Sequence, residues 1–248
     1  MIVPLRASRA VLAATGPLVL PQGRVVRRTT PRLPEAAGPT TVTAGAGARP
    51  LRLLLLGDST VAGIGVASHE EGLAGGLARE LAPRLGRPVA ATAIGRGGAT
   101  SRDLVVDLLD AAAGPWDAAF VSIGANDALA ARSRRTFARD LGTVLDRLES
   151  DSPGIALLVS SLPGFRWFEL LPQPLRWNLD LHARSLEAAA RAAIAGRAWM
   201  TPPASGYTPD FFAADRFHPG AVGYARWAAW IADAAEADGV LARLRSPR

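Results

Sequence analysis

Short apolar segments alternate with longer amphipathic ones from residue 51 onward, and this alternation limits the folds that the chain can adopt. Apolar runs bounded by Gly, Pro or polar residues predict strands at 51–56, 89–94, 118–123 and 155–160, with a weaker fifth at 198–200. Helical patterns lie between and after them, at about 70–85, 101–112, 134–150, 175–195 and 221–237. Strands that alternate with helices in this way form a parallel sheet with helices on both faces. The sequence therefore predicts an α/β fold, a three-layer α/β/α sandwich around a five-stranded parallel sheet.

The excess of positive over negative charge lies in the first fifty residues. Seven of the 28 basic residues lie in residues 1–50 beside a single acid, Glu35, and the remaining residues carry 21 charges of each sign. The net charge of +6 therefore belongs to the N-terminal segment, and the neutral remainder offers no basic face for nucleic acid. Residues 34–50 are rich in Pro, Gly, Thr and Ala, as linkers are. We expect a basic, partly apolar arm and linker at 1–50 and one domain at 51–248.

The apolar stretch at residues 10–20 leaves three interpretations of the arm open. It is shorter than the roughly 20 apolar residues that a membrane-spanning helix needs, and Pro17 and Pro21 interrupt it. The arm could pack on the domain, or its apolar stretch, flanked by arginines, could lie on an anionic membrane surface. It could also be a signal peptide, although no small-x-small cleavage site follows Leu20. A cytoplasmic or peripheral membrane location is favoured over secretion.

Two missing residue types exclude several kinds of chemistry. The chain has no cysteine, which excludes disulfides and thiolate metal sites, and no lysine, which excludes a Walker-type phosphate loop and a Schiff base. Its three histidines are too scattered for a metal site, and we expect no metal. We expect His69 in the solvated first turn of a helix and His182 on a helix surface, whereas His218 lies in a loop before Pro219-Gly220.

Residues suited to acyl transfer follow the predicted strands, where the carboxyl ends of parallel strands form one rim of a sheet. Ser59 follows the first strand and can act as a nucleophile if a base takes its proton. His218 can be that base, and Asp215, three residues before it, can hold its ring in one tautomer. Attack on a carbonyl group leaves a negative charge on its oxygen, and this oxyanion needs hydrogen-bond donors. The Ser59 backbone N–H, a glycine N–H after the second strand and the Asn126 side-chain amide can supply them.

The segments that carry these residues resemble those of the SGNH (GDSL-type) hydrolase family of esterases and lipases over residues 51–230. Gly57-Asp58-Ser59 resembles its nucleophile block, Gly124-Ala125-Asn126-Asp127 its Gly-x-Asn-Asp block, and Asp215-Arg216-Phe217-His218 its Asp-x-x-His block. The resemblance implies Ser59 as nucleophile, His218 as base, Asp215 as its orienting partner, and Ser59, Gly98 and Asn126 as the oxyanion hole, with Gly97 as the alternative to Gly98. It also implies a flavodoxin-like strand order 2-1-3-4-5, a catalytic domain at 51–248, no cofactor, and hydrolysis of carboxylic esters through an acyl-enzyme.

A candidate substrate loop spans residues 162–177, after the fourth predicted strand. It carries Phe165, Trp167 and Phe168 among prolines. These aromatic side chains would cover the acyl group of a small-molecule, lipid or glycan ester, or they would pack over a helix. Two other functions stay open. The same site would serve an acyltransferase if a sugar or lipid hydroxyl replaced water, and the same fold would serve a non-catalytic binding module.

Overall fold

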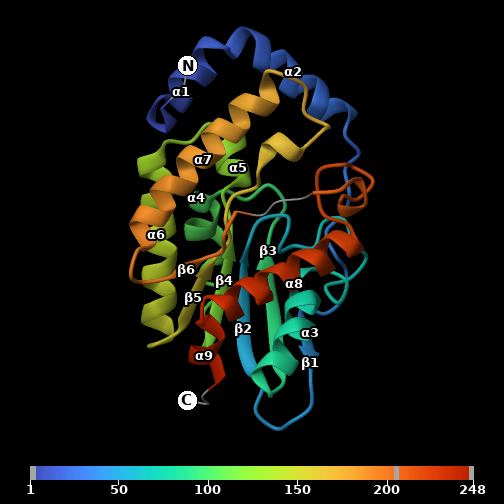
Figure 1. The fold of residues 1–248 in the computed structure, drawn as a ribbon, viewed down its shortest axis with the longest axis vertical. Coiled ribbons are helices and arrows are strands. Elements are labelled where there is room, and N and C mark those ends of the chain that lie inside the picture. The colour runs from blue at the N-terminus through green and yellow to red at the C-terminus, as the bar shows by residue number, and fades with distance from the viewer. Residues whose placement is uncertain (1–3, 204–206, 246–248) are drawn as a thin grey trace.

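A computed structural model describes residues 4–203 and 207–245 of the chain, and it confirms the predicted α/β sandwich (Figure 1). Five parallel strands pair in the order β3-β2-β4-β5-β6, which is the predicted order 2-1-3-4-5. In chain order they are β2 (Leu51–Gly57), β3 (Val89–Gly95), β4 (Ala118–Ser122), β5 (Ala156–Val159) and β6 (Trp199–Met200). Each lies within two residues of its predicted bounds.

The sheet has a sixth strand that the sequence analysis missed. β1 (Thr41–Ala44) lies inside the segment expected to be a linker and pairs antiparallel with β3. The Thr41 and Thr92 hydroxyls are 2.8 Å apart across this pair. β1 is four residues long, and none of them is buried, so it offers no apolar run of the kind that predicted the other strands. It covers the edge that β3 would otherwise expose.

The central strands are buried on both faces, as strands of a parallel sheet are. Along β2, Leu54 and Leu56 pack into one hydrophobic cluster, and Leu51, Leu53 and Leu55 pack into the other. This alternation follows from the two-residue repeat of a strand. Burial on both faces explains why the residues of β2, apart from Arg52, are almost all apolar.

Helices cover both faces of the sheet (Figure 1). The face of Leu53 carries α3 (Leu73–Leu85), α8 (Ala221–Ala237) and α9 (Val240–Arg245). The face of Leu54 carries α6 (Arg134–Asp151) and α7 (Leu175–Ile194). Shorter turns join these elements: α4 (Ser101–Asp103), the π-helical η2 (Leu104–Leu108), α5 (Ala125–Leu129), η3 (Phe165–Trp167) and η4 (Pro209–Phe211). The helix expected at 101–112 is therefore divided between α4 and η2.

The N-terminal arm forms η1 (Leu5–Ala7), α1 (Ser8–Ala14) and α2 (Gly16–Thr29), which lie along α7 (Figure 1). The Ser8 hydroxyl is 3.0 Å from His182 Nδ1, and the Ser185 hydroxyl donates to the Leu5 carbonyl at 2.7 Å. His182 is therefore fully buried, not on the surface as predicted, because the arm covers it; His69 is also buried. No helix in the described part of the chain is both long enough and apolar enough to span a bilayer.

Candidate active site

The turn after β2 presents Ser59 at the carboxyl end of the sheet. A side chain at Gly57 would place its Cβ 2.1 Å from the Ser122 carbonyl oxygen, so only glycine lets β2 and β4 approach this closely. The buried Asp58 carboxylate then accepts hydrogen bonds at 3.0 Å from the backbone and the hydroxyl of Thr60. Burial raises the pKa of Asp58 to about 6, although the hydrogen bonds from Thr60 oppose the rise. Asp58 thus holds the turn that carries Ser59.

A chain of hydrogen bonds joins Ser59 to a loop far along the sequence. Ser59 Oγ is 2.9 Å from His218 Nε2, and His218 Nδ1 is 2.6 Å from Asp215 Oδ2. The other oxygen of Asp215 accepts the backbone N–H groups of Phe217 and His218, each at 3.0 Å. Burial raises the pKa of Asp215, but the hydrogen bonds from His218 and Phe217 outweigh burial and leave it below the usual value. The carboxylate therefore stays ionised beside the imidazole.

A tight hairpin holds the histidine in place. Phe212 and Pro219 pair as an antiparallel bridge, and Ala213 N–H donates to the His218 carbonyl at 2.8 Å. Gly220 N–H donates to the Phe211 carbonyl at 2.9 Å, after which α8 begins. The loop thus presents the imidazole and leads directly into α8, which buries one face against the sheet.

The three groups expected to form an oxyanion hole have N–H hydrogens to spare. Neither the Ser59 nor the Gly98 backbone N–H donates a hydrogen bond to any residue that the structure describes. Asn126 Nδ2 donates one hydrogen bond, at 3.0 Å to the Ala99 carbonyl, and its second amide hydrogen remains. Gly98 has φ +80°, in a turn closed by Ala99 N–H donating to the Arg96 carbonyl at 3.1 Å. A left-handed residue at this place in a turn favours glycine.

The backbone N–H of Gly97, the alternative oxyanion donor, already donates a hydrogen bond. Gly97 N–H donates at 2.6 Å to the carboxylate of Glu35, in the N-terminal segment. Of the two glycines, Gly98 is therefore the one whose N–H is free. No local pattern predicts this contact, because Glu35 lies 62 positions before Gly97 in an irregular segment.

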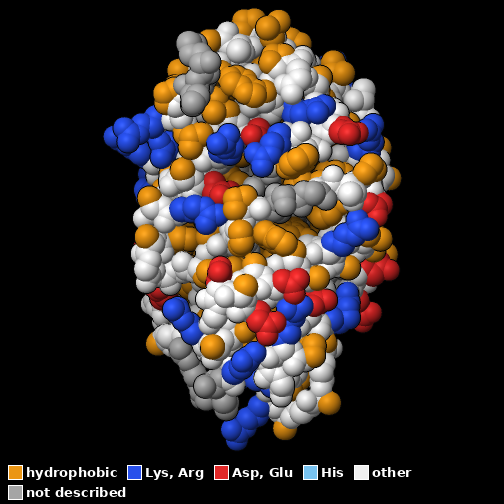
Figure 2. All heavy atoms as spheres, viewed as in Figure 1, with side chains coloured by type: hydrophobic (Ala, Val, Ile, Leu, Met, Phe, Trp, Pro, Cys, Tyr) orange, Lys and Arg blue, Asp and Glu red, His pale blue; other side chains and the backbone are white. Residues whose placement is uncertain are grey.

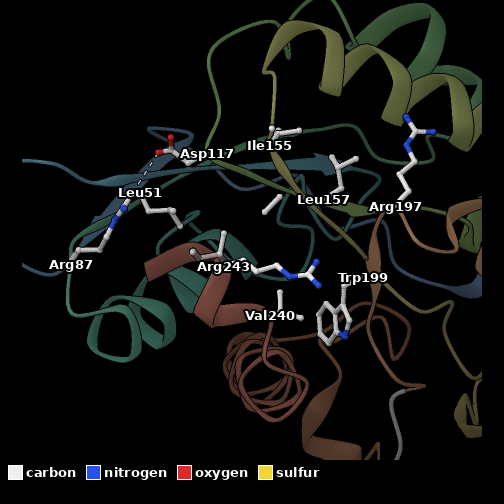
Figure 3. A pocket seen from close by; sticks show the side chains of 12 residues that line it. Leu51, Arg87, Asp117, Ile155, Leu157, Arg197, Trp199, Val240 and Arg243 are labelled. Atoms are coloured by element: carbon white, nitrogen blue, oxygen red, sulfur yellow. Dashed lines mark ion pairs between the residues drawn. The ribbon is translucent and has the colours of Figure 1, made fainter. Parts of the chain in front are cut away.

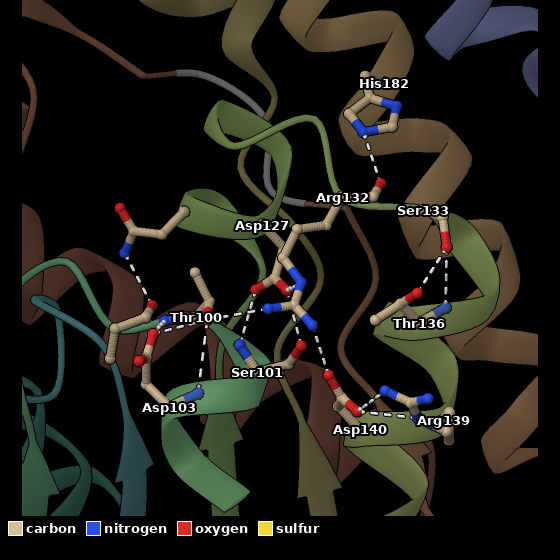
Figure 4. Close-up of polar contacts among 12 residues, drawn as sticks. Thr100, Ser101, Asp103, Asp127, Arg132, Ser133, Thr136, Arg139, Asp140 and His182 are labelled. Carbon is tan, nitrogen blue, oxygen red and sulfur yellow. Dashed lines mark hydrogen bonds and ion pairs between the residues drawn. The ribbon is translucent and has the colours of Figure 1, made fainter. Parts of the chain in front are cut away.

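A buried polar network ties together the two loops that carry Gly98 and Asn126 (Figure 4). Asp127, which has no exposed surface, accepts hydrogen bonds from the backbone and the hydroxyl of Ser101, at 2.9 and 2.6 Å. Arg132 Nε lies 3.2 Å from the same carboxylate, and the Arg132 guanidinium also pairs with the buried Asp140. The Arg132 carbonyl in turn bonds His182. This network fixes Asn126, the neighbour of Asp127, relative to the Gly98 turn.

The cavity beside Ser59 is small, about 70 Å³, and largely aromatic. Of the three residues expected in a substrate loop, only Phe168 lines it. Phe165 is buried in the core, and Trp167 is exposed on the surface. η3 is a 3-10 turn, in which successive side chains point about 120° apart, so Trp167 points away from the buried Phe165. Phe168 follows the turn and packs against Phe165, with their ring centroids 5.3 Å apart. Aromatic residues that the sequence analysis did not single out complete the wall: Tyr207, Phe211, Phe217 and Trp227.

A larger cavity, of about 190 Å³, lies at the other end of the sheet, where the strands begin (Figure 3). Three arginines line it, but Arg87 pairs with Asp117, and Arg197 pairs with Asp146 and Glu149. Only Arg243 among them has no such partner in the described chain. No serine, threonine or histidine is among the described residues that line this cavity, so these residues offer no nucleophile with a base.

The acidic side chains around Ser59 are already engaged by neighbours. Asp58 bonds Thr60, Asp215 bonds His218, and Asp127 bonds Ser101 and Arg132. Among residues 4–203 and 207–245, no three His, Asp or Glu side chains gather in positions that could hold a metal ion.

Comparisons with known proteins find relatives of this chain in sequence and in fold. Residues 55–226 match the model of the GDSL-like lipase/acylhydrolase family. The GDSL-like esterase Rv1075c of Mycobacterium tuberculosis is 32% identical over 185 residues, which span 71% of this chain and 58% of that protein. Among solved structures, the lipase Lip_vut3 from a goat rumen metagenome has a TM-score of 0.60 and 15% identity over 76% of this chain and 97% of its own. TesA has a TM-score of 0.58 and 20% identity over 75% and 98%. At such low sequence identities, the likeness to these two structures shows a common fold and nothing more.

Proposed function

The chain belongs to the GDSL-like lipase/acylhydrolase family, and from this premise we propose that it is a serine esterase that hydrolyses carboxylic esters through an acyl-enzyme intermediate. The observation that carries the proposal is the continuous contact from Ser59 Oγ through His218 to Asp215, at 2.9 and 2.6 Å. In such an arrangement the imidazole takes the serine proton while the carboxylate holds the ring and stabilises the imidazolium.

The reaction proceeds in two halves. Ser59 Oγ attacks the ester carbonyl carbon and His218 takes the hydroxyl proton, so a tetrahedral oxyanion forms. The free N–H groups of Ser59 and Gly98 and the spare amide hydrogen of Asn126 receive that charge. The intermediate collapses to the acyl-enzyme as His218 protonates the departing alcohol. Water, deprotonated by His218, then attacks the acyl-enzyme carbonyl carbon. The second tetrahedral intermediate collapses as His218 returns this proton to Ser59 Oγ, which releases the carboxylic acid and restores the enzyme.

The walls of the cavity support a short, apolar acyl group as the bound part of the substrate. Phe168, Phe211 and Phe217 face it, and its volume of about 70 Å³ leaves little room beyond a few carbon atoms. We expect p-nitrophenyl acetate or butyrate to be hydrolysed faster than the palmitate ester. A series of acyl chain lengths, with a glycan acetyl ester included, measures this directly.

The test of the nucleophile is Ser59→Ala, compared with Ser161→Ala. Both serines line the cavity, but only Ser59 contacts a histidine. Ser59→Ala is expected to lower kcat on p-nitrophenyl acetate by at least about 10³-fold, whereas Ser161→Ala stays within a few-fold of wild type. Circular dichroism checks that both variants fold. Turnover by Ser59→Ala at the wild-type rate would overturn the proposed mechanism.

We also propose that the arm contacts an anionic membrane surface. Three large apolar side chains on α2, Leu18, Leu20 and Val25, are about 60% exposed. Figure 2 shows hydrophobic side chains gathered at the end of the molecule where α1 and α2 lie. Arginines accompany them on α2, at positions 24, 27 and 28, and none forms an ion pair with a described residue. Apolar side chains interspersed with unpaired arginines suit the headgroup region of an anionic bilayer.

A triple variant tests this contact. Replacement of Arg24, Arg27 and Arg28 by glutamine should weaken cosedimentation with phosphatidylglycerol-containing vesicles several-fold. The matched control replaces Arg135, Arg184 and Arg243, which are also exposed and unpaired in the described chain, and removes the same charge elsewhere. An equal loss in both triple variants would mean that net charge, not the arm, attracts the vesicles. No loss in either would refute the contact.

A further inference from the structure

The N-terminal segment contributes a side chain to the loop that carries Gly98. Glu35, the one acid of residues 1–50, accepts the Gly97 N–H at 2.6 Å. The residues that follow it are held on the loop after Ser59, because Ala36 N–H donates to Ala62 and Ala37 N–H to Ala67, both at 3.0 Å. Glu35 thus reaches the glycine turn from a fixed backbone.

The surroundings of Gly97 also leave little room for a side chain. A Cβ at Gly97 would lie 3.2 Å from the Glu35 carboxylate and 3.0 Å from the side chain of Ile64. A hydrogen bond from a backbone N–H to a carboxylate is charge-assisted and stronger than one between neutral groups. It therefore fixes the orientation of the Gly97 amide within a turn whose two central residues are both glycine and intrinsically mobile.

We propose that Glu35 is a positioning residue for the oxyanion hole. By holding the Gly97 N–H, it fixes the Gly97–Gly98 turn with the Gly98 N–H free to meet the oxyanion. This inference rests on the proposed esterase function. Because the negative charge on the carbonyl oxygen develops fully only in the transition state, loss of this positioning lowers kcat and leaves KM nearly unchanged.

Two substitutions at one position separate the hydrogen bond from the charge. Glu35→Ala removes the acceptor, whereas Glu35→Gln keeps an oxygen acceptor and removes the charge. We expect kcat on p-nitrophenyl acetate to fall about tenfold in Glu35→Ala and less than about threefold in Glu35→Gln. Phosphonylation of Ser59 by a p-nitrophenyl phosphonate, which also builds negative charge on an oxygen in the hole, should slow by the same factors.

Glu71→Ala is the matched control. The Glu71 carboxylate accepts the Ala67 N–H at 3.1 Å, which is also a contact between a glutamate and a backbone N–H, and neither of these residues is a proposed oxyanion donor. Glu71→Ala should keep kcat within twofold of wild type. If it loses as much kcat as Glu35→Ala, or if Glu35→Ala keeps the wild-type kcat, the proposal is overturned.

Amide hydrogen exchange measured by NMR gives a readout that needs no turnover. The Gly97 N–H should exchange at least tenfold faster in Glu35→Ala than in wild type, with Glu35→Gln in between. Unchanged exchange at Gly97 and an unchanged Gly98 amide shift would refute the positioning role, whether or not the protein is an esterase. Loss of turnover in Ser59→Ala tests the esterase function separately, so the two failures are distinguishable.

Discussion

At the scale of single residues, Asp58 occupies a place that disfavours its charge. It is buried, its pKa is raised to about 6, and Thr60 is the one described residue that donates hydrogen bonds to its carboxylate. Because the folded pKa lies above that of the unfolded chain, protonation stabilises the fold as the pH falls through about 6. At pH 8 the charged carboxylate therefore costs stability that it does not cost at pH 5.

Asp58→Asn should remove this cost, since asparagine keeps an oxygen that can accept both hydrogen bonds from Thr60. The gain in the free energy of unfolding should be about 1 kcal/mol larger at pH 8 than at pH 5. Urea unfolding at the two pH values measures the difference. A gain of equal size at both would contradict the raised pKa.

Asp215→Asn tests the orienting role. The asparagine oxygen can still accept the Phe217 and His218 N–H groups, so the loop should fold, but the side chain no longer stabilises an imidazolium. We expect kcat to fall by about 10⁴-fold, as for a serine-protease triad with the same change, with little change in melting temperature. The control is Asp210→Asn, an exposed acid on η4 that pairs with Arg226. Near-normal turnover by Asp215→Asn would place the orienting group elsewhere.

Which site residues were predictable depends on whether they carry a local pattern. Ser59, Asn126 and His218 each lie in a short motif after a strand or before a helix, and the structure brings Ser59 Oγ within 2.9 Å of His218 Nε2. Glu35 and Trp227 carry no such pattern, because their places at the site depend on how distant segments pack. Phe165 was predicted to be in the substrate loop because it is an aromatic residue in a loop after a strand, but it is buried in the core.

At the scale of elements, the parallel strands were predictable because burial on both faces makes them continuous apolar runs. β1 was not, since it is short and exposed, and its pairing with β3 is a tertiary contact. The start of α3 was expected at residue 70 but lies at Leu73. The residues before it form turns instead, with Gly75 N–H bonded to the His69 carbonyl.

The network between α4, α5 and α6 depends on one guanidinium. Arg132 pairs with Asp127 and Asp140, and both carboxylates are buried. Arg132→Gln leaves two buried acids without their shared cation, so the free energy of unfolding should fall by about 3 to 5 kcal/mol. Arg139→Gln is the control, because Arg139 also pairs with Asp140 but is largely exposed, and it should cost less than about 1 kcal/mol. Equal urea midpoints for the two variants would contradict this view.

At the scale of the whole molecule, charges in the arm and in the rest of the chain are arranged differently. Thirteen arginines beyond residue 50 pair with carboxylates, whereas the arginines of residues 4–50 form no ion pair with any described residue. Both hydrophobic clusters belong almost wholly to the later residues, since Val19 is the one buried member from residues 4–50, the part of this segment that the structure describes. The arm therefore adds charge and a few contacts to a core that is built without it.

A fragment of residues 34–248 should consequently fold on its own. It keeps Glu35, β1 and every parallel strand, but loses the contacts of Ser8 with His182, of Leu5 with Ser185, and the burial of Val19. We expect one cooperative thermal transition and a free energy of unfolding about 3 kcal/mol lower than that of the full chain. The comparison fragment, 46–248, also lacks β1, so it exposes the edge of β3 and should be less stable and prone to aggregate. If 34–248 fails to give a cooperative transition while the full chain does, the arm is part of the folding unit and a domain boundary near residue 50 is wrong.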